Sequence, residues 1–300
     1  MVHGSGGFKF ESVDVDGERM LIAAPRLLPA ATQSPTKSAT QIVAHRGYHD
    51  RTAPYENTID AYQRAIALGA DLMETDIRRT ADGILVLHHD ATINGRRISD
   101  TRFADLPLLP NGQRLSTFQD LVALTAGTGA TTKLLVETKE YGYEQEIVAM
   151  LRTRLQPGQY ELMGFDLDSV RALRELAPDA RVGLLIGLMP DWENGTWPIT
   201  GASIVSKARR VGADFVGIDW HIATEDRISV VAAAGLDIAV WTVDKQNDLR
   251  RFLADSRIDR IITDTPDVAM RLRDAAKPLA PVSHITGRQA ASWWSDAVAA

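Results

Sequence analysis

Residues 58–76 read TIDAYQRAIALGADLMETD, and this stretch contains one complete helix-to-strand unit. Apolar side chains recur at helical spacing over Thr58–Leu68, and Gly69 follows as a typical helix stop. A short strand, Leu72–Asp76, then ends in two acids. A second Gly-Ala-Asp, at 212–214, again lies between a helical segment and a strand. The recurrence predicts repeated β/α units.

The same alternation continues through most of the chain. The predicted strands are Gln41–Ala44, Leu72–Asp76, Leu134–Glu137, Tyr160–Met163, Arg181–Ile186, Asp214–Gly217, Ile238–Trp241 and Arg260–Thr263. The predicted helices are Thr58–Leu68, Thr117–Ala126, Tyr143–Leu155, Leu167–Leu176, Ile204–Val211, Glu225–Ala234, Gln246–Ala254 and Pro266–Ala276. Strands that alternate with helices in this number predict an α/β fold, a TIM-type (β/α)8 barrel that forms a single domain over residues 41–276. A doubly wound open sheet has the same alternation and is the alternative fold.

Two segments with a different composition flank the predicted barrel. Residues 1–40 form a short N-terminal extension, in which Phe8–Ala24 predicts a hairpin that a proline-, threonine- and serine-containing linker follows. Residues 277–300 form a C-terminal tail that ends near Trp293 and Trp294. We expect these two rings to pack on the barrel or to join two copies of the chain as a homo-oligomer.

The composition excludes several classes of protein. The 300 residues include 33 basic and 39 acidic side chains, so no basic surplus is available for binding nucleic acid. The chain has no cysteine, which excludes disulfides and thiolate metal sites. No apolar run approaches the ~20 residues of a transmembrane segment, and the first residues lack the layout of a signal peptide. We therefore expect a soluble, cytoplasmic protein.

Three carboxylates are predicted to converge at the mouth of the barrel, where barrel enzymes carry their chemistry. Glu74 and Asp76 lie two residues apart on one strand and point the same way, and Glu137 and Lys139 repeat this spacing. Oxygen ligands favour a hard cation, so Mg²⁺ or Ca²⁺ is the expected metal. The alternative is a structural network in which the acids pair with Arg46 and Lys139.

A pair of histidines at the same mouth suits acid–base catalysis. His45 follows the first strand, and His88 and His89 follow a short extension of the second. Two imidazoles with pKa values near neutrality can take a proton from one oxygen and give a proton to another. Since neighbouring strand residues point to opposite faces, we expect only one of His88 and His89 in the site. Trp241 either fills the barrel core or forms a wall of the pocket.

Two further polar segments have ordinary structural interpretations. Glu56, Asn57 and Thr58 open the first helix, where Asn or Thr is a common N-cap and glutamate suits the helix dipole. Asp264 lies just before Pro266 and is interpreted as a cap of the last helix.

Taken in chain order, these motifs resemble the glycerophosphodiester phosphodiesterase family. The matching residues are His45-Arg46-Gly47, Glu56-Asn57-Thr58, Glu74 and Asp76, Asp82-Gly83 leading to His89-Asp90, Glu137 and Lys139, Trp241-Thr242-Val243, and Ile262-Thr263-Asp264 with Pro266. The segment after His89-Asp90 is shorter than in many members. The resemblance implies a TIM-type barrel that hydrolyses small-molecule glycerophosphodiesters to glycerol 3-phosphate and an alcohol.

The resemblance also implies roles for individual residues. His45 and His89 would be the catalytic acid–base pair, with His89 chosen over His88 because it directly precedes Asp90. One divalent cation would be held by three metal ligands, Glu74, Asp76 and Glu137. The substrate-binding residues would be Arg46 and Lys139 at the phosphate, Glu56 in support of Arg46 or of the metal, and Trp241 beside the alcohol.

Other functions are compatible with parts of this pattern. Lysophospholipase D or sphingomyelinase D activity on lipid phosphodiesters also fits the resemblance, and Trp192, Trp197 and the C-terminal tryptophans are the candidates for a lipid-facing rim. A metal-dependent barrel lyase or aldolase would use Lys139 differently, as a Schiff-base residue. A non-catalytic binding module is disfavoured, because every motif position holds a chemically competent residue.

Overall fold

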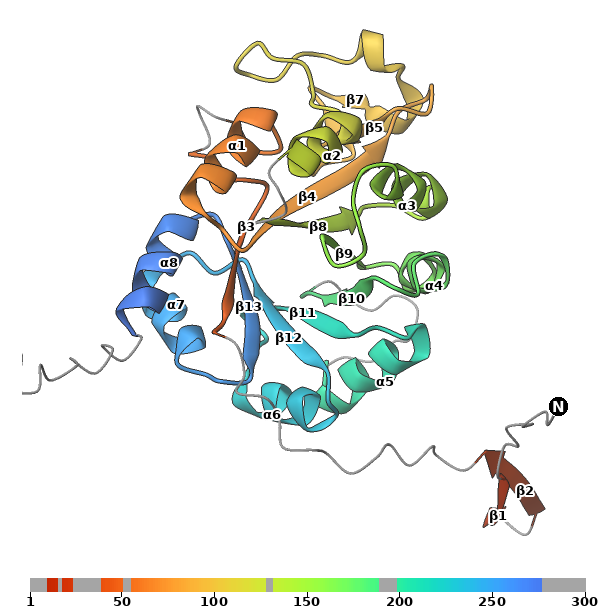
Figure 1. The fold of residues 1–300 in the computed structure, drawn as a ribbon. Coiled ribbons are helices and arrows are strands. Elements are labelled where there is room, and N and C mark those ends of the chain that lie inside the picture. The colour runs from red at the N-terminus through yellow and green to blue at the C-terminus, as the bar shows by residue number, and fades with distance from the viewer. Residues whose placement is uncertain are drawn as a thin grey trace, which may run out of the picture. The chain divides into compact units, whose positions relative to one another are not determined.

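The computed structural model describes residues 10–15, 18–23, 39–50, 55–127, 132–188 and 199–276 (Figure 1). The chain divides into two compact units, Met1–Ser38 and Ala39–Ala300. In the first unit, β1 (Phe10–Val15) and β2 (Glu18–Ala23) pair antiparallel, which is the hairpin that the sequence predicts. The four tryptophans proposed for a rim or a tail contact lie outside the described residues.

Eight strands of the second unit form a closed parallel barrel. They are β3 (Gln41–Ala44), β4 (Leu72–Arg79), β8 (Lys133–Thr138), β9 (Tyr160–Gly164), β10 (Arg181–Ile186), β11 (Phe215–Asp219), β12 (Asp237–Trp241) and β13 (Ile258–Thr263). Each strand pairs in parallel with the next, and β13 pairs with β3 to close the sheet. This confirms the TIM-type barrel and excludes the open sheet.

The helices of the described residues lie around the outside of the barrel, between consecutive strands (Figure 1). They are α1 (Ile59–Leu68), α2 (Phe118–Gly127), α3 (Glu144–Arg152), α4 (Leu167–Leu176), α5 (Gly201–Val211), α6 (Glu225–Ala233), α7 (Gln246–Leu253) and α8 (Pro266–Ala275). Their ends differ from the predicted ends by a few residues. The side chain of Thr58 caps α1 by accepting a hydrogen bond from the Ala61 N–H, and Gly69 ends the helix in the left-handed conformation.

One buried side chain from each barrel strand fills the interior of the barrel. These residues are Val43, Leu72, Leu135, Met163, Leu185, Phe215, Ala239 and Ile262. The Phe215 ring needs Gly183 beside it, because a Cβ atom at Gly183 would lie 2.2 Å from the ring. The interior is therefore packed solid, and any substrate site must lie above this layer.

A small excursion between β4 and α2 carries the two adjacent histidines. It begins with β5 (Leu85–Leu87), which pairs antiparallel with β4, and continues through β6 (Thr92–Ile93), β7 (Arg96–Arg97), η1 (Ile98–Asp100) and η2 (Phe103–Asp105). The excursion has an apolar cluster of its own, which consists of Val86, Ile93, Ile98, Leu106, Leu109 and Leu115. This cluster anchors the backbone on both sides of His88 and His89.

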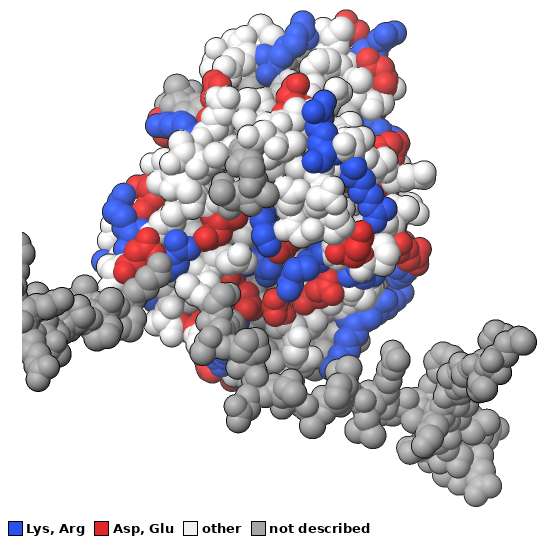
Figure 2. Space-filling view, viewed as in Figure 1, with Lys and Arg blue, Asp and Glu red and all other residues white. Residues whose placement is uncertain are grey.

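Acidic and basic side chains are interspersed over the face seen in Figure 2. Within the ranges that the structure describes, no helix combines the length and the apolar character needed to cross a membrane.

Candidate active site

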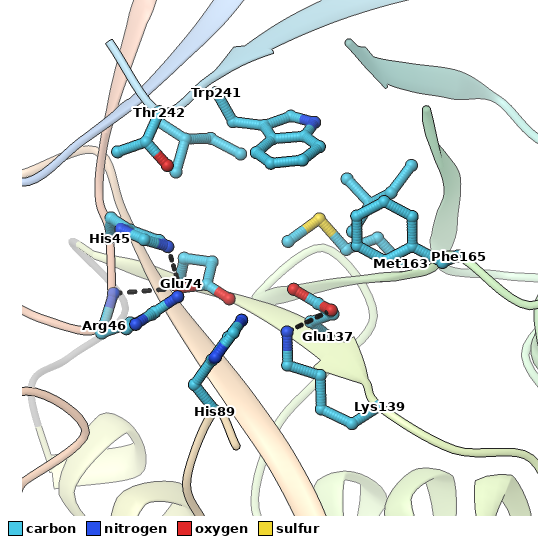
Figure 3. A pocket seen from close by; sticks show the side chains of 12 residues that line it. His45, Arg46, Glu74, His89, Glu137, Lys139, Met163, Phe165, Trp241 and Thr242 are labelled. Atoms are coloured by element: carbon cyan, nitrogen blue, oxygen red, sulfur yellow. Dashed lines mark hydrogen bonds and ion pairs between the residues drawn. The ribbon is translucent and has the colours of Figure 1, made fainter. Parts of the chain in front are cut away.

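A cavity of about 160 Å³ opens among the C-terminal ends of the barrel strands (Figure 3). Its lining has a polar side and an apolar side. The polar residues are His45, Arg46, Glu74, His89, Glu137, Lys139 and Thr242, and the apolar residues are Met163, Phe165, Leu185, Trp241 and Ile262. Six of the nine residues predicted for the site lie on the polar side, and Trp241 lies on the apolar side.

A tight turn after β3 presents His45 and Arg46 to this cavity. Arg46 has a φ of 55° and Gly47 a φ of 85°, so the chain reverses through two left-handed residues. A Cβ atom at Gly47 would lie 2.8 Å from the Ala61 Cβ, which shows that the turn packs directly against α1. The backbone N–H of Arg46 donates to Glu74 Oε2 at 2.9 Å and thereby ties the turn to β4.

The three predicted metal ligands do converge. Glu74, Asp76 and Glu137 are buried, and each offers a carboxylate oxygen within 4.8 Å of the others. Lys139 Nζ lies 2.6 Å from Glu137 Oε1 and 2.9 Å from Asp76 Oδ1. The structural network considered above is therefore present, but it does not satisfy every acid. Glu74 Oε1 is buried and accepts no hydrogen bond from the described residues.

The protonation of these acids reflects their crowding. Burial, Asp76 and Glu137 hold the pKa of Glu74 well above its ordinary value. Burial and the neighbouring Asp76 raise the pKa of Glu137 to about 7, although Lys139 opposes the shift. Burial would also raise the pKa of Asp76, but Lys139 and Arg46 hold it below its ordinary value. A group of buried oxygen donors with excess negative charge and an unpartnered oxygen fits a hard divalent cation.

The Arg46 guanidinium lies between two acids that hold its plane. Its Nη1 donates to Glu56 Oε1 at 2.9 Å, and its Nε lies 3.2 Å from Asp76 Oδ2. Asn57 is not the cap that its position suggests, since it is buried with a φ of 56° and donates to Asp76 Oδ2 at 2.8 Å. The hydroxyl of Tyr62 in turn donates to Asn57 Oδ1 at 2.8 Å.

The two adjacent histidines directly follow β5 and lie in different surroundings. His89 lines the cavity, whereas His88 does not and places its Nε2 3.3 Å from the carbonyl of Thr92. Arg78 fixes this part of the loop by donating to the His89 carbonyl from Nε at 2.9 Å and from Nη2 at 2.6 Å. Burial lowers the pKa of His89, and the positive charges of Lys139 and Arg46 lower it further.

The interpretation of Asp264 as a helix cap is wrong. Thr265 occupies the cap position of α8, and Asp264 instead places Oδ1 2.6 Å from His45 Nδ1. The same oxygen lies 3.5 Å from Nε2 of the buried His49. Burial opposes ionisation, but the two imidazoles hold the pKa of Asp264 below its ordinary value. The sequence carries no local signal of this contact, because it joins residues 219 positions apart.

The apolar side of the cavity is built around Trp241. Its indole N–H donates to the carbonyl of Gly217 at 2.9 Å, which fixes the ring across the end of β11. Phe165 meets this ring edge to face, with 5.6 Å between the ring centroids. Met163, Leu185 and Ile262 form the floor and belong also to the interior layer of the barrel. In the sequence these three side chains look like any other core residues.

Comparison with known proteins gives consistent results. Residues 45–268 match the Glycerophosphoryl diester phosphodiesterase family. A glycerophosphodiester phosphodiesterase from Caldanaerobacter subterraneus is 26% identical over 265 residues, which cover 78% of this chain and 97% of that protein. A probable glycerophosphodiester phosphodiesterase 1 from Mycobacterium tuberculosis is 30% identical over 241 residues, with 69% of this chain and 83% of that protein covered.

A solved structure shares the fold. It is a phosphodiesterase from Oleispira antarctica in complex with the product sn-glycerol-3-phosphate, and it covers 79% of this chain and 97% of its own with a TM-score of 0.66 at 20% identity. The family match spans nearly the whole barrel, and it includes every residue of the polar side of the cavity. The chain therefore belongs to the glycerophosphoryl diester phosphodiesterase family, a family of phosphoric diester hydrolases.

Proposed function

We propose that this protein hydrolyses glycerophosphodiesters to glycerol 3-phosphate and an alcohol with the help of one divalent cation, Mg²⁺ or Ca²⁺. The observation that carries the proposal is the polar side of the cavity, where two histidines, the positively charged side chains of Arg46 and Lys139, and two of the three clustered acids, Glu74 and Glu137, face one small space. The cavity volume of about 160 Å³ is below the range typical of sites for drug-sized ligands and suits a compact phosphoester. The glycerol 3-phosphate bound to the Oleispira antarctica relative is a ligand of this kind.

Arg46 and Lys139 would bind the phosphate. Glu56 and Asp76 hold the guanidinium of Arg46 in one plane. Its remaining N–H groups are therefore already oriented to donate two parallel hydrogen bonds to phosphoryl oxygens. Glu74, Asp76 and Glu137 would hold the cation, which supplies positive charge beside the phosphoryl oxygens. Trp241 and Phe165 would receive the carbon atoms of the substrate on the opposite side.

His89 and His45 would move the protons. The lowered pKa of His89 favours its neutral form, so His89 suits the base that deprotonates the attacking hydroxyl, either of water or of the substrate glycerol. His45 Nδ1 lies 2.6 Å from Asp264 Oδ1, and His45 Nε2 lies 4.0 Å from Glu74 Oε2, so the ring is held at the polar side of the cavity across from His89. With His89 assigned as the base, His45 is the second imidazole of the cavity and would be the acid that protonates the departing alcohol.

The test is a panel of glycerophosphodiesters with choline, ethanolamine, glycerol and inositol head groups, assayed with release of glycerol 3-phosphate as the readout. Activity should require added Mg²⁺ or Ca²⁺, should disappear with excess chelator and should return when the ion is restored. Assays with lysophospholipids as substrates test the alternative that the protein cleaves lipid phosphodiesters. The exposed ring of Phe165 at the cavity favours this alternative. Full turnover after prolonged dialysis against chelator would contradict metal dependence.

A further inference from the structure

His49 is a buried histidine that the proposed chemistry does not use. Only 5% of the residue is exposed, so its ring nitrogens depend on polar partners inside the protein. A buried imidazole has to be compensated by polar or charged partners, so an apolar residue of similar size would be the simpler choice for a purely structural position. The one acid within ion-pair distance of His49 in the described chain is Asp264.

The carboxylate of Asp264 lies between two imidazoles. Its Oδ1 is 2.6 Å from His45 Nδ1 and 3.5 Å from His49 Nε2. The left-handed turn at Arg46 and Gly47 produces this arrangement, because it reverses the chain and returns residue 49 to the acid that residue 45 already contacts. Since an ionised carboxylate only accepts hydrogen bonds, the proton of His45 lies on Nδ1 and the cavity side of the ring is Nε2.

The backbone of Asp264 is held separately. Asp244 Oδ1 accepts a hydrogen bond from the Asp264 N–H at 2.8 Å and another from the Thr263 hydroxyl at 3.1 Å. The two imidazoles that contact Oδ1 restrict rotation of the Asp264 side chain. The geometry points to His49 as a positioning residue that holds the Asp264 carboxylate against His45 and so fixes the proton-donating histidine of the proposed reaction.

This inference rests on the proposed function, and kinetics with two leaving groups test it. His49→Leu removes the N–H at similar volume, whereas His49→Gln retains an N–H donor near the position of Nε2. We expect His49→Leu to lower kcat about tenfold on an alkyl diester, with KM nearly unchanged, and His49→Gln to stay within about threefold. A nitrophenyl diester needs little protonation on departure, so both variants should cleave it almost normally if His45 is the acid.

The controls separate positioning from loss of structure. Tyr48→Phe alters the neighbouring residue of the same turn without touching Asp264 and should leave both substrates unaffected. In an Asp264→Asn background, the His49→Leu change should have no further effect, since the group through which it acts is gone. Three results would overturn the inference. The first is that His49→Leu loses equal activity on both substrates although His45→Ala discriminates between them. The others are an additive loss of activity in the double variant and no loss of activity in His49→Leu.

A measurement that needs no turnover keeps the inference testable if the protein hydrolyses none of the diesters. The Nδ1 proton of His45 should give a low-field proton NMR signal in the wild type and in His49→Gln. The signal should broaden or disappear in His49→Leu, and in His49→Met if the leucine variant does not fold. A signal that is unchanged in the folded apolar variant overturns the role of His49, whereas inactivity of the wild type on every diester overturns the proposed function alone.

Discussion

Individual side chains in this site are constrained by more than one neighbour. Asp76 contacts Arg46, Lys139 and Asn57, and each of these contacts comes from a different segment of the chain. Arg46 is in turn bound to Glu56, and the Asn57 amide is bound to Tyr62. A change in one of these residues will therefore shift its partners as well, and effects on activity should not be additive.

The separation of His88 from His89 makes a sharp prediction at this scale. His89→Ala should lower kcat/KM by about 100- to 10,000-fold, because it removes a group that transfers a proton. His88→Ala should stay within a few fold, since that ring contacts the Thr92 carbonyl outside the cavity. Steady-state kinetics on one glycerophosphodiester checks both variants. A large loss of activity in His88→Ala together with normal activity in His89→Ala would show that His88, and not His89, transfers the proton.

The raised pKa of Glu137 predicts how cation binding depends on pH. A proton on this carboxylate competes with the ion, so apparent affinity for Mg²⁺ or Ca²⁺ should weaken as the pH falls through the pKa of about 7. Binding near that pH should release protons, which titration calorimetry in buffers of different ionisation enthalpy would detect.

The same shift sets the sign of a stability effect. Between the ordinary value of 4.5 and about 7, Glu137 binds more protons in the folded than in the unfolded protein. The free energy of unfolding without added ion should therefore decrease as the pH rises across this window. Glu137→Gln should flatten the dependence. An affinity for the ion that is constant from about pH 6 to about pH 8 would contradict both expectations.

At the scale of elements, the strands and helices follow from local sequence, whereas several contacts between them do not. Alternating short apolar runs and amphipathic segments predict all eight barrel strands, and the two-residue spacing predicts that Glu74 and Asp76 share a side. Asp264 has a convincing local interpretation before the proline of α8, but its actual partner, His45, directly follows the first strand of the barrel. The floor of the cavity consists of apolar strand residues, and only the closed barrel shows which apolar residues line the cavity.

The packing of β10 against β11 predicts how much one added methyl group would destabilise the barrel. Gly183→Ala would place a Cβ atom 2.2 Å from the Phe215 ring inside the barrel. Overpacking of this kind costs about 1–3 kcal/mol, so the thermal midpoint should fall by several degrees. Gly127→Ala is the matched control, because no atom lies within 4 Å of its Cβ position on α2. Equal midpoints for the two variants would show that the interior layer can rearrange.

At the scale of the whole molecule, every residue assigned to the proposed reaction lies in the barrel unit. The interior layer, the cavity and the acid triad all lie within the second compact unit. A protein that begins at Ala39 should therefore keep its kcat/KM and its thermal midpoint, and comparison with the full chain checks this. A large decrease in kcat/KM or in the thermal midpoint would show that residues 1–38 contribute to the activity or the stability of the barrel.

The contact between His45 and Asp264 also has a consequence for the order of synthesis. It joins the residue that follows the first barrel strand to the residue that follows the last one, where β13 pairs with β3 and closes the barrel. A growing chain that has left the ribosome only as far as β12 already carries the acid triad, Arg46, Lys139 and both histidines. It still lacks the acid that orients His45. We therefore expect hydrolytic activity to appear only after β13 and Asp264 have been synthesised and the barrel has closed.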